Sequence, residues 1–148
     1  MPKPNRLTPT SSNVVVEQQL DNSLAQIEVK MTADCLGFSG SMYYGIEDFV
    51  RDAIEQYKPK RQKLVVVLDT DGGLIEVAQR ITDTLRYHYP ACIDFVIPNY
   101  AMSAGTVLAL SGDAIHMDYY SILGPIDPQV YNRDGKLVPA LGYLAKFD

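Results

Sequence analysis

The sequence predicts an α/β domain with a mainly parallel β-sheet and flanking helices, because two patterns alternate along its 148 residues. The first is a continuous apolar run, clearest in KLVVVLDT at 63–70, which is typical of a strand buried on both faces of a parallel sheet. The second is the recurrence of apolar residues at helical spacing, as in GIEDFVRDAIEQYKP at 45–59. Right-handed crossovers in such a fold place the helices on the faces of the sheet.

The N-terminal elements are predicted from composition and alternation. Residues 1–24 are expected to form a flexible arm, because the chain begins with a stretch rich in Pro, Ser, Thr and Asn. The folded domain is expected to span 25–148. Within it, AQIEVKM at 25–31 alternates apolar and polar residues like a half-buried strand, and LGFSGSMYYG at 36–45 is typical of a glycine-rich loop.

The remaining elements follow as an alternation of helices and strands. Helices are expected in GIEDFVRDAIEQYKP (45–59), LIEVAQRITDTLRYHYP (74–90) and SAGTVLALSGD (103–113), and strands in KLVVVLDT (63–70), CIDFVIP (92–98), AIHMD (114–118) and SILGPIDPQ (121–129), the last running into a Pro-rich turn. The closing VPALGYLAKFD at 138–148 has the pattern of a helix in progress, which predicts a domain truncated at its C-terminus.

Composition argues against several classes of function. Eighteen acidic and 13 basic residues give a formal charge of −5, which disfavours a nucleic-acid backbone or an anionic membrane surface as the main partner. The basic stretch KPKRQK at 58–63 is best explained as a solvated connection. No stretch has the length and apolarity of a membrane span or the pattern of a signal peptide, so a soluble cytoplasmic protein is expected.

Neither cysteines nor carboxylates predict a metal site. Cys35 and Cys92 are too few and too unpatterned for a disulfide framework or a metal cluster. Asp69 and Asp71 stand two positions apart without a nearby histidine or third acid, and Asp71 beside two glycines is typical of a turn. No metal and no cofactor are therefore expected.

Two loops follow predicted strands and could carry acyl-transfer chemistry, which needs a nucleophile, a base and two donors for the oxyanion. Ser103 precedes a helix and is followed by small residues, and the N–H of Ala104 lies at that helix start. Gly73 offers a second N–H, since glycine permits close backbone approach. The alternative is that Ser103 only caps the helix and that Gly72 and Gly73 only form a turn.

The ordered motifs resemble the serine dehydrogenase proteinase family, within the Clp protease and crotonase superfamily. They are LDTDGGLIEVAQRITDTLR, YAMSAGT and LGPIDPQ, and the resemblance covers about residues 64–143. It implies a Clp/crotonase-like fold of repeated β-β-α units. It also implies that Ser103 is the nucleophile, that the N–H groups of Gly73 and Ala104 form an oxyanion hole, and that relatives assemble as homo-oligomers.

The general base is the open part of this prediction. The Clp protease triad has a histidine where this chain reads SILGPIDPQ, and His88 and His116 lie in other segments without an expected role. Signal peptide peptidase A and similar enzymes use a Ser-Lys dyad instead, whose position suits Lys146. Lys146 could equally be a solvated lysine, or the base could lie beyond Asp148.

Two nearby residues complete the candidates. Lys136 is in a turn-like stretch and is expected to stay solvated, and Asp127 could orient a base or substrate or simply form a turn before Pro128. The sequence thus predicts a serine peptidase that acts on protein or peptide substrates without nucleic acid. The alternatives are a catalytically inactive interaction domain of the same fold and a crotonase-like acyl-CoA enzyme, which the serine at position 103 disfavours.

Overall fold

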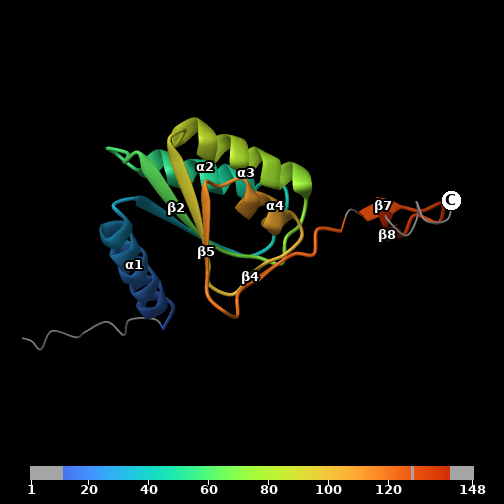
Figure 1. Cartoon of the computed structure of the whole chain (residues 1–148), viewed down its shortest axis with the longest axis horizontal. Coiled ribbons are helices and arrows are strands. Elements are labelled where there is room, and N and C mark those ends of the chain that lie inside the picture. The colour runs from blue at the N-terminus through green and yellow to red at the C-terminus, as the bar shows by residue number, and fades with distance from the viewer. Residues whose placement is uncertain (1–11, 128, 141–148) are drawn as a thin grey trace, which may run out of the picture.

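The computed structural model describes residues 12–127 and 129–140, and its central feature is a parallel β-sheet. The four strands follow the order β1 (Asp34–Ser39), β2 (Lys63–Asp69), β3 (Cys92–Ile97) and β5 (Ala114–Met117) (Figure 1). Because each strand is added on the same side of the one before it, right-handed crossovers carry the connecting helices over one face. The predicted mainly parallel sheet is confirmed.

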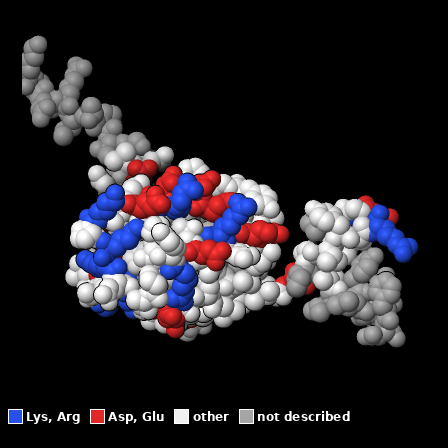
Figure 2. All heavy atoms as spheres, turned by 90° about the horizontal axis from the view of Figure 1, so that it is seen from above, with Lys and Arg blue, Asp and Glu red and all other residues white. Residues whose placement is uncertain are grey.

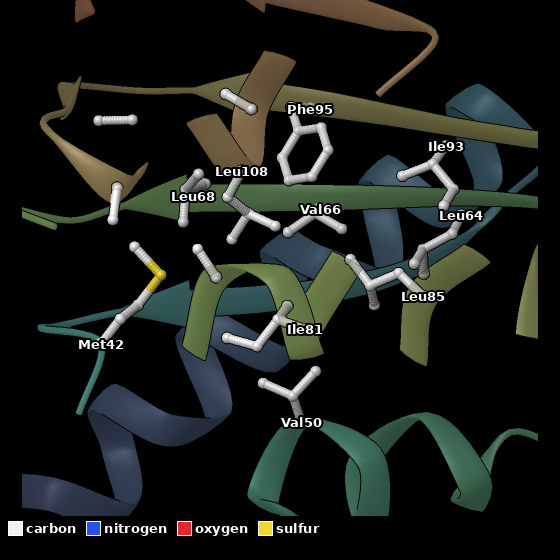
Figure 3. Packing of buried hydrophobic residues seen from close by; sticks show 14 of the residues in the cluster. Met42, Val50, Leu64, Val66, Leu68, Ile81, Leu85, Ile93, Phe95 and Leu108 are labelled. Carbon is white, nitrogen blue, oxygen red and sulfur yellow. The ribbon is translucent and has the colours of Figure 1, made fainter. Parts of the chain in front are cut away.

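Three helices cover that face: α2 (Ile46–Gln56), α3 (Ile75–His88) and α4 (Ala104–Leu110), with α3 contacting both of the others (Figure 1). Alternate residues of β2 and β3 point toward these helices, as the strand repeat requires. Their side chains interlock with those of the helices in the main hydrophobic core (Figure 3). The residues labelled there are Met42, Val50, Leu64, Val66, Leu68, Ile81, Leu85, Ile93, Phe95 and Leu108.

The helix α1 (Ser12–Met31) lies against the opposite face of the sheet (Figure 1). Leu24, Ile27 and Met31 pack on side chains of β1 and β2 in a second, smaller apolar cluster. Their spacing of three and four residues puts them on one side of a helix. Because α1 begins at Ser12, the predicted flexible arm is wrong from that residue onward; residues 1–11 lie outside the described part of the chain.

Two neighbouring predictions are also wrong. Residues 25–31, predicted as a strand, are helical. The prediction failed because apolar alternation over so short a stretch fits the repeat of a helix as well as that of a strand. Val29, which the strand pattern expected to be buried, is 79% exposed. The loop predicted at 36–45 begins inside β1. The glycine that suggested a loop, Gly37, lies under the Leu24 side chain of α1, where an added Cβ would come within 3.4 Å of Leu24 Cδ1.

A smaller layer of strand pairing follows the carboxyl ends of the main strands. β4 (Tyr100–Ala101) pairs in parallel with β6 (Ile122–Leu123), and its Ala101 also pairs with Thr70. Gly73 in turn pairs with Met42. The main strands are thus followed by short extended segments, and helices follow these, which confirms the predicted β-β-α units. This layer brings the loops after β2 and β3 side by side.

The last described residues form an antiparallel hairpin of β7 (Gln129–Tyr131) and β8 (Leu137–Pro139), which extends away from the body (Figure 1). The helix predicted at 138–148 is wrong at its start, because Val138 pairs with Val130 in this hairpin. Residues 141–148 lie outside the described part, so the rest of that prediction stays a prediction.

Acidic and basic side chains are interspersed over the helical face (Figure 2). The KPKRQK stretch is more than a solvated connection, because the guanidinium of Arg61 donates hydrogen bonds to the carbonyls of Glu28, at 2.9 Å, and Ala33. The backbone N–H of Arg61 donates to the Asp34 carboxylate at 2.9 Å. Arg61 thereby ties the end of α1 to β1. Among the described residues, no helix is both long and apolar enough to cross a membrane.

Candidate active site

Ser103 lies at the turn between β4 and α4, directly before the first helical residue. Its φ of 51° and ψ of −123° lie outside the regions that L-residues normally occupy. The predicted N-cap position is confirmed, but the Ser103 hydroxyl makes no capping hydrogen bond. Helix capping therefore does not explain why a partly exposed serine is held in this strained conformation.

Backbone hydrogen bonds fix this turn against the end of β2. The N–H of Met102 donates to the Thr70 carbonyl at 2.9 Å, and the N–H of Gly105 donates to the Met102 carbonyl at 2.8 Å. Glycine is required at position 105, because an added Cβ would overlap with Cγ2 of Thr70. The start of α4 is thus packed tightly on the strand that leads into the Gly72–Gly73 loop.

Thr106 joins the same turn to the Pro-rich loop after β6. Its buried hydroxyl donates to the Ala101 carbonyl at 2.6 Å and accepts from the N–H of Gly124 at 2.7 Å. One side chain therefore links β4, α4 and the start of the loop that contains Asp127. The sequence prediction missed Thr106, although a polar side chain in the first turn of an apolar helix was a signal for such a link.

The glycines of the loop after β2 lie against Ser103 and Met42. A Cβ on Gly72 would lie 2.8 Å from Ser103 Cβ and 3.2 Å from Ala104 N. A Cβ on Gly73 would overlap with the Met42 carbonyl, and the two glycines have φ values of 98° and 143°. Only glycine satisfies both the close approach and these φ values. The absence of side chains lets the loop after β2 approach the Ser103 turn closely.

Two backbone donors lie where the loop and the turn meet. The N–H groups of Gly73 and Ala104 have no acceptor among the residues that the structure describes. Met42 binds the backbone groups on either side of Gly73, at 2.8 and 2.9 Å, so the N–H of Gly73 points toward the other edge, where β4 and Ser103 lie. Two free donors beside a free hydroxyl can hold the oxyanion of an acyl-transfer reaction.

The acidic residues near the loop have separate environments. Asp71 accepts a hydrogen bond from the Ser41 hydroxyl at 2.8 Å, which fits its predicted turn role. Asp69 has one buried carboxylate oxygen, Oδ1, without a hydrogen-bond partner in the described structure. Asp127 accepts from Gln129 Nε2 at 3.2 Å. Across residues 12–127 and 129–140, no group of three or more His, Cys, Asp or Glu side chains could hold a metal ion.

Neither histidine belongs to the Ser103 turn. His116 Nε2 lies 2.9 Å from Asp94 Oδ2 on the face of the sheet opposite α4, and Lys63 Nζ lies 2.6 Å from the same oxygen. His88 is at the C-terminal end of α3, with Nδ1 3.1 Å from Lys60 Nζ. Burial and the neighbouring Lys60 charge lower the pKa of His88.

Of the two lysines that follow Ser103, one lies within the described residues. Lys136 lies in the turn between β7 and β8, where its backbone N–H donates to Asn132 Oδ1 at 2.8 Å, and it is exposed as predicted. Lys146 lies outside the described residues. The structure thus brings together Ser103, Ala104, Gly72 and Gly73, as the sequence predicts.

The chain is similar to proteins of known sequence along half its length. It is 43% identical over 72 residues to the uncharacterized protein MJ0137 of Methanocaldococcus jannaschii, which is 49% of this chain and 25% of that protein. It is 38% identical over 72 residues to the uncharacterized protein MJ1495 of the same organism, covering 49% of this chain and 24% of that protein. The chain thus spans about a quarter of the length of the curated relatives it matches.

Solved structures share the fold. A serine-to-alanine variant of the 1510-N membrane-bound stomatin-specific protease superposes with a TM-score of 0.60 at 20% identity, covering 76% of this chain and 56% of that one. A lysine-to-alanine variant of that protease in complex with a substrate peptide gives 0.59 at 22% identity, covering 76% and 53%.

Together with the ClpP-like family model that matches the chain, these likenesses and the parallel sheet with its β-β-α units show the expected Clp/crotonase-like α/β fold. The model of the ClpP-like, SDH-type serine proteinases matches residues 16–141, which is most of the chain. The match includes most of α1, the Ser103 turn and the Gly72–Gly73 loop. The chain therefore belongs to the family of ClpP-like, SDH-type serine proteinases.

Proposed function

We propose that this protein is a serine peptidase that hydrolyses peptide bonds through an acyl-enzyme on Ser103. Membership of a serine proteinase family supports the reaction class. The observation that carries the proposal is the Ser103 turn itself, where a strained serine with an uncapped hydroxyl lies beside two backbone N–H groups without acceptors. A structural turn needs neither the strain nor the unpaired donors.

In this mechanism Ser103 Oγ attacks the carbonyl carbon of the scissile peptide bond while its proton passes to a base. The N–H groups of Gly73 and Ala104 hold the oxyanion that forms. The base then protonates the leaving amine, the C–N bond breaks, and an ester on Ser103 remains. Water attacks that ester by the same route and releases the acid. Gly72 contributes by letting the loop after β2 approach Ser103 and Ala104 closely.

We assign the base to Lys146, which would act as a Ser-Lys dyad with Ser103. Lys136 and Lys146 are the lysines that follow Ser103 in the sequence, and Lys136 is exposed in the β7–β8 turn. A lysine base must be neutral, which burial favours by lowering its pKa. The resemblance to Ser-Lys peptidases supports the assignment. The proposal requires no cofactor and includes a cytoplasmic homo-oligomer that acts on protein or peptide substrates.

A fluorophosphonate probe tests the nucleophile in the full-length protein, because the probe forms a covalent bond only with an activated serine. Labelling is expected on Ser103 and should be lost in Ser103→Ala. Ser111→Ala is the matched control, since Ser111 lies at the other end of α4 with its hydroxyl bonded to the Leu108 carbonyl. Absence of labelling in the native full-length protein would favour the inactive interaction domain.

The base is tested separately by comparing Lys146→Ala with Lys136→Ala. Loss of a general base lowers the rate by about 100-fold or more, so the Lys146 variant should label and hydrolyse peptides slowly over the whole accessible pH range. The Lys136 variant should behave as the native protein. Equal rates in both variants would remove Lys146 from the mechanism and leave the role of Ser103 intact.

A further inference from the structure

Thr70 directly follows β2 and is buried, with 1% of its surface exposed. Its N–H donates to the Tyr100 carbonyl at 3.0 Å, and its carbonyl accepts from the N–H of Met102 at 2.9 Å. Backbone pairing with β4 and the residue after it therefore fixes where Thr70 lies. The contacts of its side chain need a separate explanation.

The hydroxyl of Thr70 holds the first glycine of the loop after β2. Its oxygen accepts a buried hydrogen bond from the N–H of Gly72 at 3.0 Å. The carbonyl of Gly72 accepts from the N–H of Met42 at 2.8 Å. Because a peptide group is planar and trans, the N–H of Gly73 points opposite to that carbonyl, away from Met42. The direction of the Gly73 donor thus follows from the two bonds that hold Gly72.

The methyl group of Thr70 contacts the start of α4. A Cβ added to Gly105 would overlap with Thr70 Cγ2, so the methyl group fills the place beside this glycine. Gly105 directly follows Ala104, and its N–H closes the turn by donating to the Met102 carbonyl at 2.8 Å. One side chain therefore contacts the segments of both oxyanion donors, the Gly72–Gly73 loop through its hydroxyl and the α4 turn through its methyl group.

The spacing of the two donors matters as much as the direction of each. An oxyanion hole needs both nitrogens at about 2.7–3.1 Å from one oxygen. A displacement of about 1 Å at a reacting centre can cost roughly 100-fold in rate. Gly73 N and Ala104 N belong to different loops, so a contact that spans both loops controls their spacing. The side chain of Thr70 makes such a contact.

We propose that Thr70 is a positioning residue that holds the N–H groups of Gly73 and Ala104 at the spacing that the oxyanion requires. Its hydroxyl sets the orientation of the Gly72–Gly73 loop, and its methyl group sets the distance between that loop and the α4 turn. In this role Thr70 acts through the two donors and takes no proton. The inference rests on the proposed peptidase function, because it concerns the oxyanion hole of that reaction.

The test compares Thr70→Val with Thr70→Ser in the full-length protein, with a fluorophosphonate as the probe. Thr70→Val keeps the shape but removes the acceptor of the Gly72 N–H, and should lower the maximal labelling rate of Ser103 by about 30-fold. The probe concentration that gives half the maximal rate should stay unchanged, because the oxyanion hole acts on the reaction and not on the first binding step. Thr70→Ser keeps the acceptor and should label within about fivefold of the native rate.

Two variants complete the set. Thr82→Val is the matched control, because the Thr82 hydroxyl on α3 bonds to Ser111 Oγ at 3.3 Å, away from the loop after β2. It should label at the native rate. Thr70→Ala removes both contacts without adding bulk and should label at least as slowly as Thr70→Val. It keeps the test decisive if the valine variant does not fold.

Three readouts separate positioning from a loss of stability and from proton transfer. Urea denaturation should show similar losses of stability in Thr70→Val and Thr70→Ser, so a merely structural role would lower both labelling rates equally. The pH dependence of labelling should keep its native midpoint in Thr70→Val, because this side chain exchanges no proton with the base. In the crystal structure of the labelled valine variant, the phosphonyl oxygen should contact Ala104 N and not Gly73 N.

Four results would overturn the inference. They are native labelling in Thr70→Val or Thr70→Ala, equal rates in the valine and serine variants, a shifted pH midpoint in Thr70→Val, and an adduct of that variant that contacts both donors. Labelling of Ser103 in the native protein would still support the peptidase function in each of these cases. A native protein whose Ser103 does not label would overturn that function and this role together.

Discussion

At the scale of single residues, the conformation of Ser103 is the most informative feature. A positive φ costs an L-residue about 1–3 kcal/mol, and such strain persists where the surrounding structure enforces it. Here the enforcing contacts are the bonds of Met102 with Thr70 and Gly105 and the close approach of Gly72. In this conformation the Ser103 hydroxyl makes no capping hydrogen bond, and Ser103 Cβ lies close to Gly72.

Because of this strain, glycine at position 103 should give a more stable protein than alanine, which is the reverse of the usual order. Ser103→Gly should be more stable than Ser103→Ala by about 1 kcal/mol, because glycine adopts φ 51° without strain. At Ser111, whose φ is −78°, the order should be the opposite, with alanine more stable than glycine. Urea denaturation of the four variants measures both differences. Alanine variants that are more stable than the glycine variants at both positions would show that Ser103 is not strained.

Gly72 gives a second prediction at this scale. Gly72→Ala should lower fluorophosphonate labelling of Ser103 by about 100-fold or more, because the added methyl group enters the oxyanion space beside Ala104 N. Gly40→Ala is the matched control, since Gly40 also has a positive φ, 131°, but its Cβ would meet nothing within 4 Å. The control should lose some stability and keep its labelling rate. Similar labelling losses in both variants would point to backbone strain alone.

At the scale of elements, the sequence predicted those with a long and unambiguous repeat. The buried run of β2 and the apolar stripes of α2 and α3 each show one period, and all three elements are where they were expected. Short alternations failed, because 25–31 fits a strand and a helix equally until the packing of Leu24 and Met31 on the sheet decides between them. The pairing of Met42 with Gly73 is a long-range contact that no local pattern encodes.

The hydroxyl of Thr106, which joins β4, α4 and the loop after β6, is expected to stabilise the folded protein. Thr106→Val keeps the shape of the side chain but removes the hydroxyl bonds to the Ala101 carbonyl and the Gly124 N–H, which keep only their own bond to each other at 3.3 Å, and each lost bond costs about 0.5–1.5 kcal/mol. Thr106→Ser keeps the hydroxyl and should lose much less. Urea denaturation measures the free energy of unfolding of both variants. A valine variant as stable as the native protein would show that the hydrogen bonds of the Thr106 hydroxyl do not stabilise the fold.

At the scale of the whole molecule, charged side chains link the sheet to its surroundings. Burial alone would raise the pKa of Asp94, but hydrogen bonds from Lys63, His116 and Cys92 outweigh it and lower the pKa. The hydrogen bond from Arg86 lowers the pKa of Asp113, with a further contribution from the backbone N–H of Ile93. These pairs form only when β2, β3, β5 and α3 are assembled, which is why the sequence could not predict them.

The lowered pKa of Asp94 has a defined sign for stability. The folded protein binds fewer protons at Asp94 than the unfolded chain, whose pKa is about 3.9. The resulting stability is fully present above that pH and is lost as the pH falls through the lower, folded pKa. Urea denaturation between pH 5 and pH 2 should therefore show a falling free energy of unfolding, with a shallower fall in Asp94→Asn. The exposed Asp83→Asn should keep the native slope, and an unchanged slope in Asp94→Asn would contradict the assignment.

Two regions of the molecule differ in what the sequence could predict. The pairing of Ser103 with the two glycines follows from their places at the ends of neighbouring parallel strands, which must meet at one edge of the sheet. The packing of α1 on the sheet could not be predicted, because its residues were expected to form an arm up to residue 24 and a strand at 25–31.

The central claim is that the Ser103 turn holds an oxyanion between the N–H groups of Gly73 and Ala104. The most direct measurement is a crystal structure of the full-length protein after reaction with a fluorophosphonate, whose tetrahedral phosphorus mimics the acyl-transfer intermediate. We predict a phosphorus–oxygen bond to Ser103 Oγ, with a phosphonyl oxygen about 2.7–3.1 Å from both Gly73 N and Ala104 N. An adduct on another serine, or a phosphonyl oxygen that contacts neither N–H, would contradict the account.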